Sequence, residues 1–368
     1  MKEKYRMQCK HKDVKKPLKG MTVEWLAEEC GTTGDFLWIL AKDSTFMYKP
    51  PRKQLKRSGN GYREIDPPKH QYKRILRKIT KVLSSNMRHH PAAHGGVPYR
   101  SSFTSAKPHC GAKFIVTRDI RECYPSISSQ NLFRSFRLLG ASLSFAKFLS
   151  AIMTVHNHIP QGGPPSSLAL NLYFRRMDDH FYRRAQSQGG NYRRFADDFV
   201  ISNNSRKKAV ALESELDHSI SHRGLEVNEK KREKKGFLSG DQLKEIHSLV
   251  VNCRRGLKPK REHIAKGLQL AEHYARCCTC AKPADLPSLA KLRQRATGMM
   301  YYFRQADFSP ARHIRNMLEH ADKKVLRMLQ SRGLQPHKNK WWLVHATRNE
   351  PQRLLCLWEP SAQVCSVA

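Results

Sequence analysis

Two neighbouring carboxylates, Asp197 and Asp198, lie within a short hydrophobic segment, and this arrangement constrains the fold more than any other feature of the sequence. The segment, residues 192–202, contains two β-prone runs separated by Ala-Asp-Asp, a pattern that predicts a β-hairpin. Adjacent carboxylates repel each other and lose solvation when buried, so they need a compensating cation. Magnesium prefers such oxygen ligands, together with substrate phosphates. The hairpin is therefore predicted to be a metal-binding turn for phosphoryl transfer.

A second Asp-Asp pair, Asp178 and Asp179, provides a comparison within the same chain. Hydrophobic residues recur around it at helical spacing, and neighbouring residues of a helix point in different directions. Arg175 and Arg183 stand four residues before and after Asp179, where they can form ion pairs along the helix. We therefore expect this pair to belong to a salt-bridged helix face, and only the hairpin pair to be catalytic.

A third carboxylate, Asp119, lies at the end of the strand predicted at residues 113–120. Asp at a strand end often only caps the following segment, and the hairpin pair taken alone is compatible with a simple turn. A strand-end carboxylate beside a hairpin that carries two more is the arrangement that a two-metal site requires. We expect Asp119 and Asp197 to bridge two Mg²⁺ ions, with Mn²⁺ as an alternative, and Asp198 to assist ligation or hold the hairpin.

The formal net charge is +37, from 68 Lys and Arg against 31 Asp and Glu. Such an excess repels itself unless a polyanion neutralises it, so nucleic acid is the expected partner. A cationic surface kept for solubility or membrane contact is the alternative. No signal peptide is visible, the longest apolar run at 36–41 is too short to span a bilayer, and the ten cysteines are irregularly spaced. These features predict a cytoplasmic protein with reduced thiols and no membrane contact.

Hydrophobic periodicity and turn residues predict the order of the elements. Helices are expected at residues 22–29, 35–41, 69–88, 130–155, 168–181 and 205–222. Strands are expected in a basic hairpin at 47–68 with a turn at 59–61, at 113–120, within 224–231 and at 246–252. The composition then changes to basic helices with aromatics that include Trp341 and Trp342, which places a domain boundary near residue 254.

Four motifs, in this order, resemble those of the reverse transcriptase family. They are Asp119 with Tyr124, a Gln-Gly-x-x-x-Ser loop at 161–167, a Tyr-x-Asp-Asp box at 195–198 in which Phe195 replaces Tyr, and a Gly-Leu…Asn…Lys segment at 224–231. The resemblance covers residues 20–310 and implies an α+β right-hand polymerase with fingers, a ferredoxin-like palm and a helical thumb. The implied domains are an N-terminal extension and fingers at 1–111, a palm at 112–254 interleaved with part of the fingers, and a thumb and RNA-binding region at 255–368.

The resemblance also implies roles for individual residues. Tyr124 is expected beneath the incoming sugar, where it excludes a 2′-hydroxyl, although a packing role is the alternative. Gln161 and Gly162 are expected to contact the nascent base pair. Arg63 of the basic hairpin is our candidate for the triphosphate, because its planar fork matches phosphate oxygens. Lys231 is expected to protonate the leaving pyrophosphate, although it also fits a solvated basic face.

Two further stretches resemble those of bacterial retron reverse transcriptases. Residues 90–109 are similar to the retron stretch with Asn-Ala-x-x-His, in which Ser105 replaces Asn. Residues 246–252 are similar to Val-Thr-Gly-Leu-x-Val-Asn, in which His247 and Ser248 replace Thr-Gly. The retron resemblance implies synthesis of RNA-linked single-stranded DNA (msDNA) from dNTPs on a cognate noncoding RNA, in antiphage defence and with an effector protein as partner.

Other assignments stay open at the level of sequence. A group II intron-like or other defence-type reverse transcriptase is one alternative, and a catalytically silent RNA-binding protein of the same fold is another. No domain of the ribonuclease H kind is apparent, so the family resemblance implies that template RNA, if it is removed at all, is removed by a separate host enzyme. Cys277, Cys278 and Cys280, with His273 one helical turn earlier, form a metal-like cluster, but the absence of a second Cys-x-x-Cys disfavours zinc.

Overall fold

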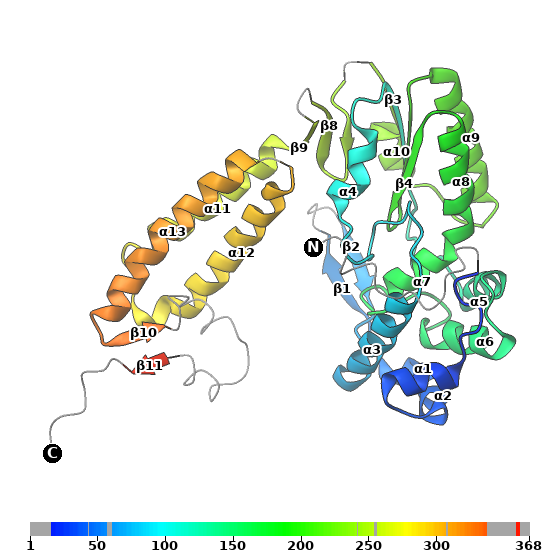
Figure 1. The fold of residues 1–368 in the computed structure, drawn as a ribbon, viewed down its shortest axis with the longest axis horizontal. Coiled ribbons are helices and arrows are strands. Elements are labelled where there is room, and N and C mark those ends of the chain that lie inside the picture. The colour runs from blue at the N-terminus through cyan, green and yellow to red at the C-terminus, as the bar shows by residue number, and fades with distance from the viewer. Residues whose placement is uncertain are drawn as a thin grey trace. The chain divides into compact units, whose positions relative to one another are not determined.

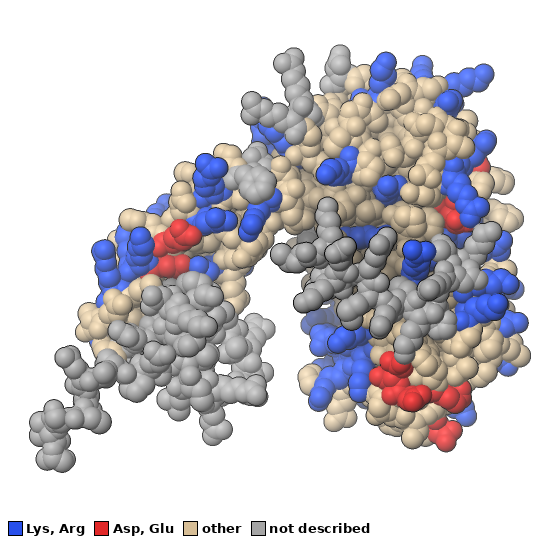
Figure 2. All heavy atoms as spheres, in the orientation of Figure 1, with Lys and Arg blue, Asp and Glu red and all other residues tan. Residues whose placement is uncertain are grey.

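The computed structural model of the chain forms two compact units, Met1–Ile246 and His247–Ala368 (Figure 1). The residues that it describes are 16–42, 44–56, 61–240, 242–253, 256–306, 308–336 and 358–360. The predicted turn residues Gly59 and Asn60 and the aromatics Trp341 and Trp342 lie outside the described residues. Lys and Arg side chains are spread over the visible surface of both units, whereas Asp and Glu gather in a few small groups (Figure 2).

A four-stranded antiparallel sheet forms the centre of the first unit. Its strands follow the order β4 (Asn191–Phe195), β5 (Asp198–Asn203), β3 (Phe114–Asp119) and β6 (Phe237–Leu238). Helices α8 (Arg175–Ser187) and α9 (Arg206–Ser221) pack on these strands, and they lie beside β4 in Figure 1. The mixture of helices with antiparallel sheet confirms the predicted α+β class.

Several predicted helices are present with bounds close to those expected. Helix α1 (Val23–Cys30) begins after Thr22, whose hydroxyl accepts a hydrogen bond from the Trp25 amide, and ends at Gly31 with φ of 61°. Such a hydroxyl cap and a left-handed glycine are ordinary signals for the two ends of a helix. The others are α2 (Gly34–Lys42), α3 (His70–Asn86) and α9. Helix α3 buries the apolar face that its sequence predicts, with Tyr72, Leu76, Ile79 and Leu83 in the core.

Four predicted elements differ from the structure. The single helix expected at 130–155 is two helices, α5 (Ser129–Leu138) and α6 (Leu143–Ile152), because Gly140 adopts φ of 93° between them. The helix expected at 168–181 is interrupted at Phe174, between α7 (Ser166–Tyr173) and α8. Within 224–231, the expected strand is limited to a bridge at Val227, and α10 (Glu229–Lys235) follows. The strand expected at 246–252 is interrupted at His247 and Ser248, which have φ of 50° and 66°.

The basic hairpin of the first unit consists of β1 (Arg52–Leu55) and β2 (Tyr62–Ile65). Arg52 pairs with Ile65 and Gln54 with Arg63, so alternation along the strands puts these four side chains on one face. The remaining short elements of this unit are η1 (Ser44–Met47), α4 (Ser102–Ala106), η2 (Lys107–His109) and β7 (Glu245–Ile246).

The second unit is mainly helical, as the sequence predicts from residue 256. Its elements are β8 (Leu249–Cys253), β9 (Gly256–Pro259), α11 (Arg261–Cys277), η3 (Pro283–Asp285), α12 (Leu286–Arg304), α13 (Phe308–Gln330), β10 (Leu334–Pro336) and β11 (Trp358–Pro360). The three helices share their own core, in which Tyr274 and Phe303 are fully buried. Within the described part of the chain, no helix has the length and apolarity needed to cross a membrane.

Candidate active site

The register of the central sheet brings three carboxylates together. Asp119, the last residue of β3, pairs with Asp198, the first residue of β5. Asp198 also pairs with Phe195 at the end of β4, so the two strands are joined by the two-residue turn Ala196–Asp197. One carboxylate oxygen from each of the three aspartates lies within 4.8 Å of the others. The predicted hairpin is therefore present, with a turn one residue shorter than expected because Asp198 begins the strand.

The turn is held in an uncommon backbone conformation. Ala196 adopts φ of 57°, in the left-handed region that residues with a Cβ rarely occupy, at a cost of about 1 kcal/mol or more. Gly95 approaches it so closely that a Cβ at that position would lie 2.3 Å from the Ala196 nitrogen. The neighbouring Gly96 is similarly close to Ser167, where a Cβ would lie 2.3 Å from the Ser167 Cβ. The Gly-Gly pair therefore packs between the hairpin turn and the Gln-Gly loop.

Burial and mutual repulsion make ionisation of these carboxylates costly. Burial, a hydrogen bond shared with Asp198 and the charge of Asp198 raise the pKa of Asp119 to about 7. Burial and the charge of Asp198 raise the pKa of Asp197 to about 6. A divalent cation would favour the ionised forms, and an all-carboxylate set of oxygen donors fits hard cations such as Mg²⁺ or Mn²⁺.

Lys231 reaches the carboxylate cluster from helix α10. Its Nζ lies 2.5 Å from Asp119 Oδ2, while the Asn228 side chain donates to Asp119 Oδ1 at 3.1 Å. The Asn228 amide also donates to the Asp119 carbonyl at 2.8 Å, which fixes the start of α10 against the end of β3. The Lys231 side chain is 62% exposed, so its ammonium can reach a group that arrives from solvent.

Tyr124 and the Gln-Gly loop lie near the same end of the sheet. The half-buried Tyr124 hydroxyl shares a hydrogen bond with the Ser167 side chain, and burial and the charge of Asp197 raise the Tyr124 pKa to about 12. The main chain of Gln161 makes two hydrogen bonds with Asp66: its amide donates to Oδ2 at 3.1 Å and its carbonyl accepts from the Asp66 amide at 3.0 Å. These contacts connect the loop to the segment just after β2.

Gly162 lies in the Gln-Gly loop and Arg63 lies in strand β2, the two parts of the chain that Asp66 connects. Gly162 has φ of 95°, and a Cβ there would lie 3.0 Å from Ile65 Cγ2. The face of the hairpin that carries the Ile65 side chain is therefore turned toward the loop. Arg63 is exposed on that same face. Gly162 also borders a cavity of about 750 Å³, which is lined on the side of α3 by Lys73, Arg77 and Lys81.

Residues 53–249 match the family model described as reverse transcriptase (RNA-dependent DNA polymerase). The matched segment is more than half of the chain and contains the three aspartates, Tyr124, the Gln-Gly loop and Lys231. The chain belongs to the reverse transcriptase family.

Several retron members of this family are similar to the chain. Retron Ec86 reverse transcriptase of Escherichia coli is 32% identical over 199 residues, which are 53% of this chain and 61% of the relative. Retron Mx65 reverse transcriptase of Myxococcus xanthus is 28% identical over 220 residues, 55% of this chain and 51% of the relative. Retron Se72 reverse transcriptase of Salmonella heidelberg is 31% identical over 175 residues, 46% of each chain. The predicted similarity to bacterial retron reverse transcriptases is confirmed, and the chain spans 46–61% of these relatives.

Solved structures of telomerase are more distant in sequence. Telomerase from Candida albicans in complex with the TWJ fragment of telomeric RNA has a TM-score of 0.42 at 12% identity, covering 88% of this chain and 66% of that chain. Apo telomerase from Candida tropicalis has a TM-score of 0.41 at 11% identity, covering 89% and 74%. The family assignment rests on the sequence match and not on these structures.

In this member of the family, the second Asp-Asp pair is only partly what the sequence predicts. Asp179 is partly exposed and forms an ion pair with Arg183 at 2.5 Å, as expected for a helix face. Asp178 is also ion-paired, but with a residue outside its helix: its side chain is fully buried and binds Arg194 of β4 at 2.6 Å. Tyr192 also donates its hydroxyl to Asp178 at 2.7 Å. The sequence does not predict this partner, because helical spacing alone does not show which polar residue of a helix faces a buried arginine from another element.

Several residues near the site are not singled out by the sequence. Gly95, Asp66, Asn171 and Arg194 are buried or closely packed supports of the turn and the Gln-Gly loop. The Gly-Gly step at 95–96 signals a close backbone approach, but it does not indicate the partner. Among the residues that the structure describes, the three aspartates are the one group of His, Cys, Asp and Glu that brings three ligand atoms together, so the Cys277 cluster is not such a group.

Proposed function

We propose that this chain is an RNA-directed DNA polymerase, a nucleotidyltransferase that joins dNTPs on an RNA template. The observation that carries the proposal is the meeting of Asp119, Asp197 and Asp198 within 4.8 Å inside a reverse transcriptase domain. We assign residues 1–111 to an N-terminal extension and fingers, 112–254 to the palm, and 255–368 to the thumb and RNA-binding region. The large basic excess supports an RNA template and a DNA product as partners.

The three aspartates are suited to hold two divalent ions, Mg²⁺ or alternatively Mn²⁺. The chemistry that such ions would supply when bound is stabilisation of negative charge on the attacking 3′-oxygen and on the leaving pyrophosphate oxygen. Burial and neighbouring carboxylates raise the pKa values of Asp119 and Asp197 to about 7 and 6, and both groups would have to be ionised to hold the ions. Asp198 stands at the first position of β5 and completes the set.

The remaining site residues act on the substrate in this proposal. Tyr124 supports the incoming sugar and leaves no room for a 2′-hydroxyl, while Gln161 and Gly162 contact the nascent pair. Arg63 binds the triphosphate; it lies on the same face of the hairpin as Ile65, which packs next to Gly162. The Lys231 ammonium, which is ion-paired with Asp119 and largely exposed, donates a proton to the leaving pyrophosphate.

We further propose that the product is the RNA-linked single-stranded DNA of a retron, made on a structured noncoding RNA in antiphage defence with an effector protein. The support is the similarity to retron reverse transcriptases at 28–32% identity. Sequencing the nucleic acid that co-purifies with the protein tests this part. A covalently joined RNA–DNA product is expected, and co-purifying RNA without attached DNA would contradict it.

Extension of a DNA primer on an RNA template tests the polymerase activity. The double substitution Asp197→Ala, Asp198→Ala is expected to lower the extension rate by at least about 10³-fold, and EDTA to abolish it. The matched control is Asp179→Ala, which removes a partly exposed carboxylate from the other Asp-Asp pair. Equal activity of the double variant and the wild type would refute the assigned site.

A further inference from the structure

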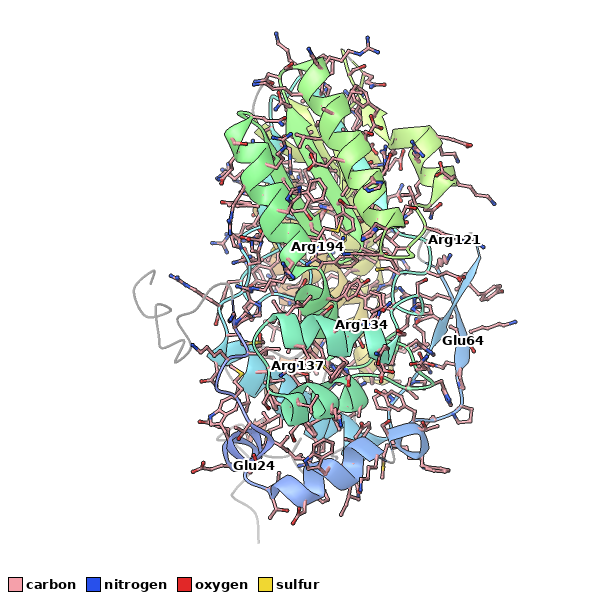
Figure 3. All side chains as sticks on the ribbon, turned by 90° about the vertical axis from the view of Figure 1, so that its right-hand side faces the viewer. Glu24, Glu64, Arg121, Arg134, Arg137 and Arg194 are labelled. Atoms are coloured by element: carbon pink, nitrogen blue, oxygen red, sulfur yellow. The ribbon has the colours of Figure 1, made fainter. Side chains whose placement is uncertain are left out.

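A buried polar network lies behind the hairpin turn, on the side of the sheet that α8 covers. Arg194 of β4 is its centre, with no exposed surface, and it lies in the interior of the first unit in Figure 3. Its Nε and one terminal nitrogen bind the two oxygens of Asp178, at 2.9 and 2.6 Å. That terminal nitrogen also donates to Asn171 Oδ1 at 3.1 Å. The buried charge is thus matched by a carboxylate and an amide.

The remaining terminal nitrogen of Arg194 reaches the turn itself. It donates to the carbonyl oxygen of Ala196 at 2.8 Å, so the guanidinium holds the residue with the left-handed backbone. The carbonyl of Ala196 belongs to the peptide that joins Ala196 to Asp197. Any rotation of that peptide changes where the Asp197 side chain begins, and therefore where its carboxylate lies.

Asn171 connects the same network to the loop that contains Gly95, which lies on the other side of the turn. Its side-chain nitrogen donates to the Gly95 carbonyl at 2.9 Å, and Gly95 packs against the Ala196 backbone. The loop is also paired with β4, because the His94 amide donates to the Arg194 carbonyl and the Arg194 amide to the Ala92 carbonyl, both at 2.8 Å. The turn is therefore held from two directions by groups that share Asn171.

We propose that Arg194 is a positioning residue, which with Asp178 and Asn171 holds the Ala196–Asp197 turn in the conformation that brings Asp197 to Asp119 and Asp198. The inference rests on the proposed function, because it concerns the same carboxylate site. A conformation that is locally unfavourable persists only where surrounding contacts over-determine it. An arginine suits this task because its planar fork makes several directed hydrogen bonds at once, whereas a lysine ammonium does not reproduce that geometry.

The sheet provides a matched control for this substitution. Arg118 of β3 is equally buried and lies in the same row across the strands, since Phe199 pairs with both Arg118 and Arg194. Its partners are Glu213 and Asp217 of α9 and the carbonyls of Thr117 and Gly236, which lie outside the turn. Arg118→Lys therefore disturbs the ion pairs of another buried arginine, whose carboxylate partners are 20–23% exposed, without touching Ala196.

The experiment compares full-length wild type, Arg194→Lys and Arg118→Lys in three measurements. The unfolding midpoint reports folding, titration calorimetry with Mn²⁺ reports the carboxylate site without turnover, and primer extension separates kcat from the KM for dNTP. Arg194→Lys is expected to weaken Mn²⁺ binding about tenfold and to lower kcat about 100-fold, the loss that a displacement of about 1 Å can cause. Its KM is expected to stay within about threefold of wild type, and Arg118→Lys to leave Mn²⁺ binding within about threefold.

Wild-type Mn²⁺ affinity in folded Arg194→Lys, or equal losses in both variants, would overturn the inference. Should Arg194→Lys not fold, Asn171→Leu takes its place, because it removes the bonds to Gly95 and Arg194 while keeping every charge. Its expected loss of Mn²⁺ affinity is about tenfold, and unchanged affinity would overturn the inference. A wild-type protein that binds Mn²⁺ but extends no primer would refute the proposed function alone.

Discussion

Two opposing effects act on the pKa of Asp119. An ammonium group lies 2.5 Å from its carboxylate, yet its pKa is raised to about 7 rather than lowered. The reason is that burial and the adjacent Asp198 outweigh Lys231, whose mostly exposed charge is screened by water. One lysine therefore leaves the three-carboxylate cluster short of positive charge, and this deficit is what a divalent cation would correct.

The raised pKa values predict how metal-free stability depends on pH. Asp197 titrates near 6 in the folded protein and near 4 when unfolded, so its protonated form favours folding. Its contribution is complete below about pH 4 and is lost as the pH rises through about 6. In EDTA, the unfolding free energy of wild type relative to Asp197→Asn is expected to fall by about 1–2 kcal/mol over this range, measured by urea denaturation.

Added Mg²⁺ supplies the control for this measurement. Because the ion binds the ionised carboxylates, it is expected to stabilise wild type increasingly as the pH rises from 5 to 8 and to have a smaller effect on Asp197→Asn. If the unfolding free energy of wild type relative to Asp197→Asn rises with pH in EDTA, the prediction is wrong. That result would show that positive charges of the protein itself already compensate the ionised carboxylates.

At the scale of elements, the active turn depends on the packing of a loop against a hairpin. The loop that contains Gly95 lies about a hundred residues before β4 in the chain, but its backbone pairs with that strand. The absence of a side chain at residue 95 allows the two backbones to meet. The hairpin alone therefore does not determine the position of Asp197.

Gly95→Ala tests this dependence. The new methyl would lie 2.3 Å from the Ala196 nitrogen and 2.9 Å from its Cα, and backbone atoms cannot rotate away as a flexible side chain can. The turn is expected to shift and the extension rate to fall about 100-fold, as measured by single-turnover primer extension. Gly34→Ala is the control, because its methyl would meet Glu24 Oε1 at an ordinary 3.8 Å. Wild-type rates in Gly95→Ala would show that the loop does not support the turn.

At the scale of the whole molecule, the dominant property is charge. Lys and Arg outnumber Asp and Glu by 68 to 31, and they are spread over the visible surface in Figure 2. Some of this charge is used internally, as in Arg118 and Arg194, whose carboxylate partners are also within the first unit. The exposed remainder is available to phosphates, including Arg77 and Lys81, which line the cavity beside Gly162 together with the partly exposed Lys73.

RNA affinity is therefore expected to fall steeply with salt, because each phosphate contact releases counterions. With several such contacts, the association constant should decrease about 10³-fold or more between 50 and 200 mM KCl, measured by fluorescence anisotropy with a labelled RNA hairpin. A neutral-phosphate analogue of the same hairpin is the control. An affinity that does not change with salt would show that the basic surface is not where RNA binds.

Local patterns in the sequence are sufficient for much of this protein. The hairpin of residues 192–202, the capped helix α1 and the amphipathic helix α3 follow from turn chemistry, capping residues and periodicity, because those interactions involve residues close in the chain. The same patterns place Asp119 at the end of a strand and Lys231 a few residues after a turn. The order of the motifs was enough to predict the family.

Only the tertiary structure decided which groups meet across the sheet and behind it. Strand register puts Asp119 opposite Asp198, and the fold buries Asp178 against Arg194 and seats Gly95 on Ala196. These contacts join residues that are 16 to about a hundred positions apart. Their energies come from burial and from directed hydrogen bonds in a dry interior, which no local pattern of polar and apolar residues encodes.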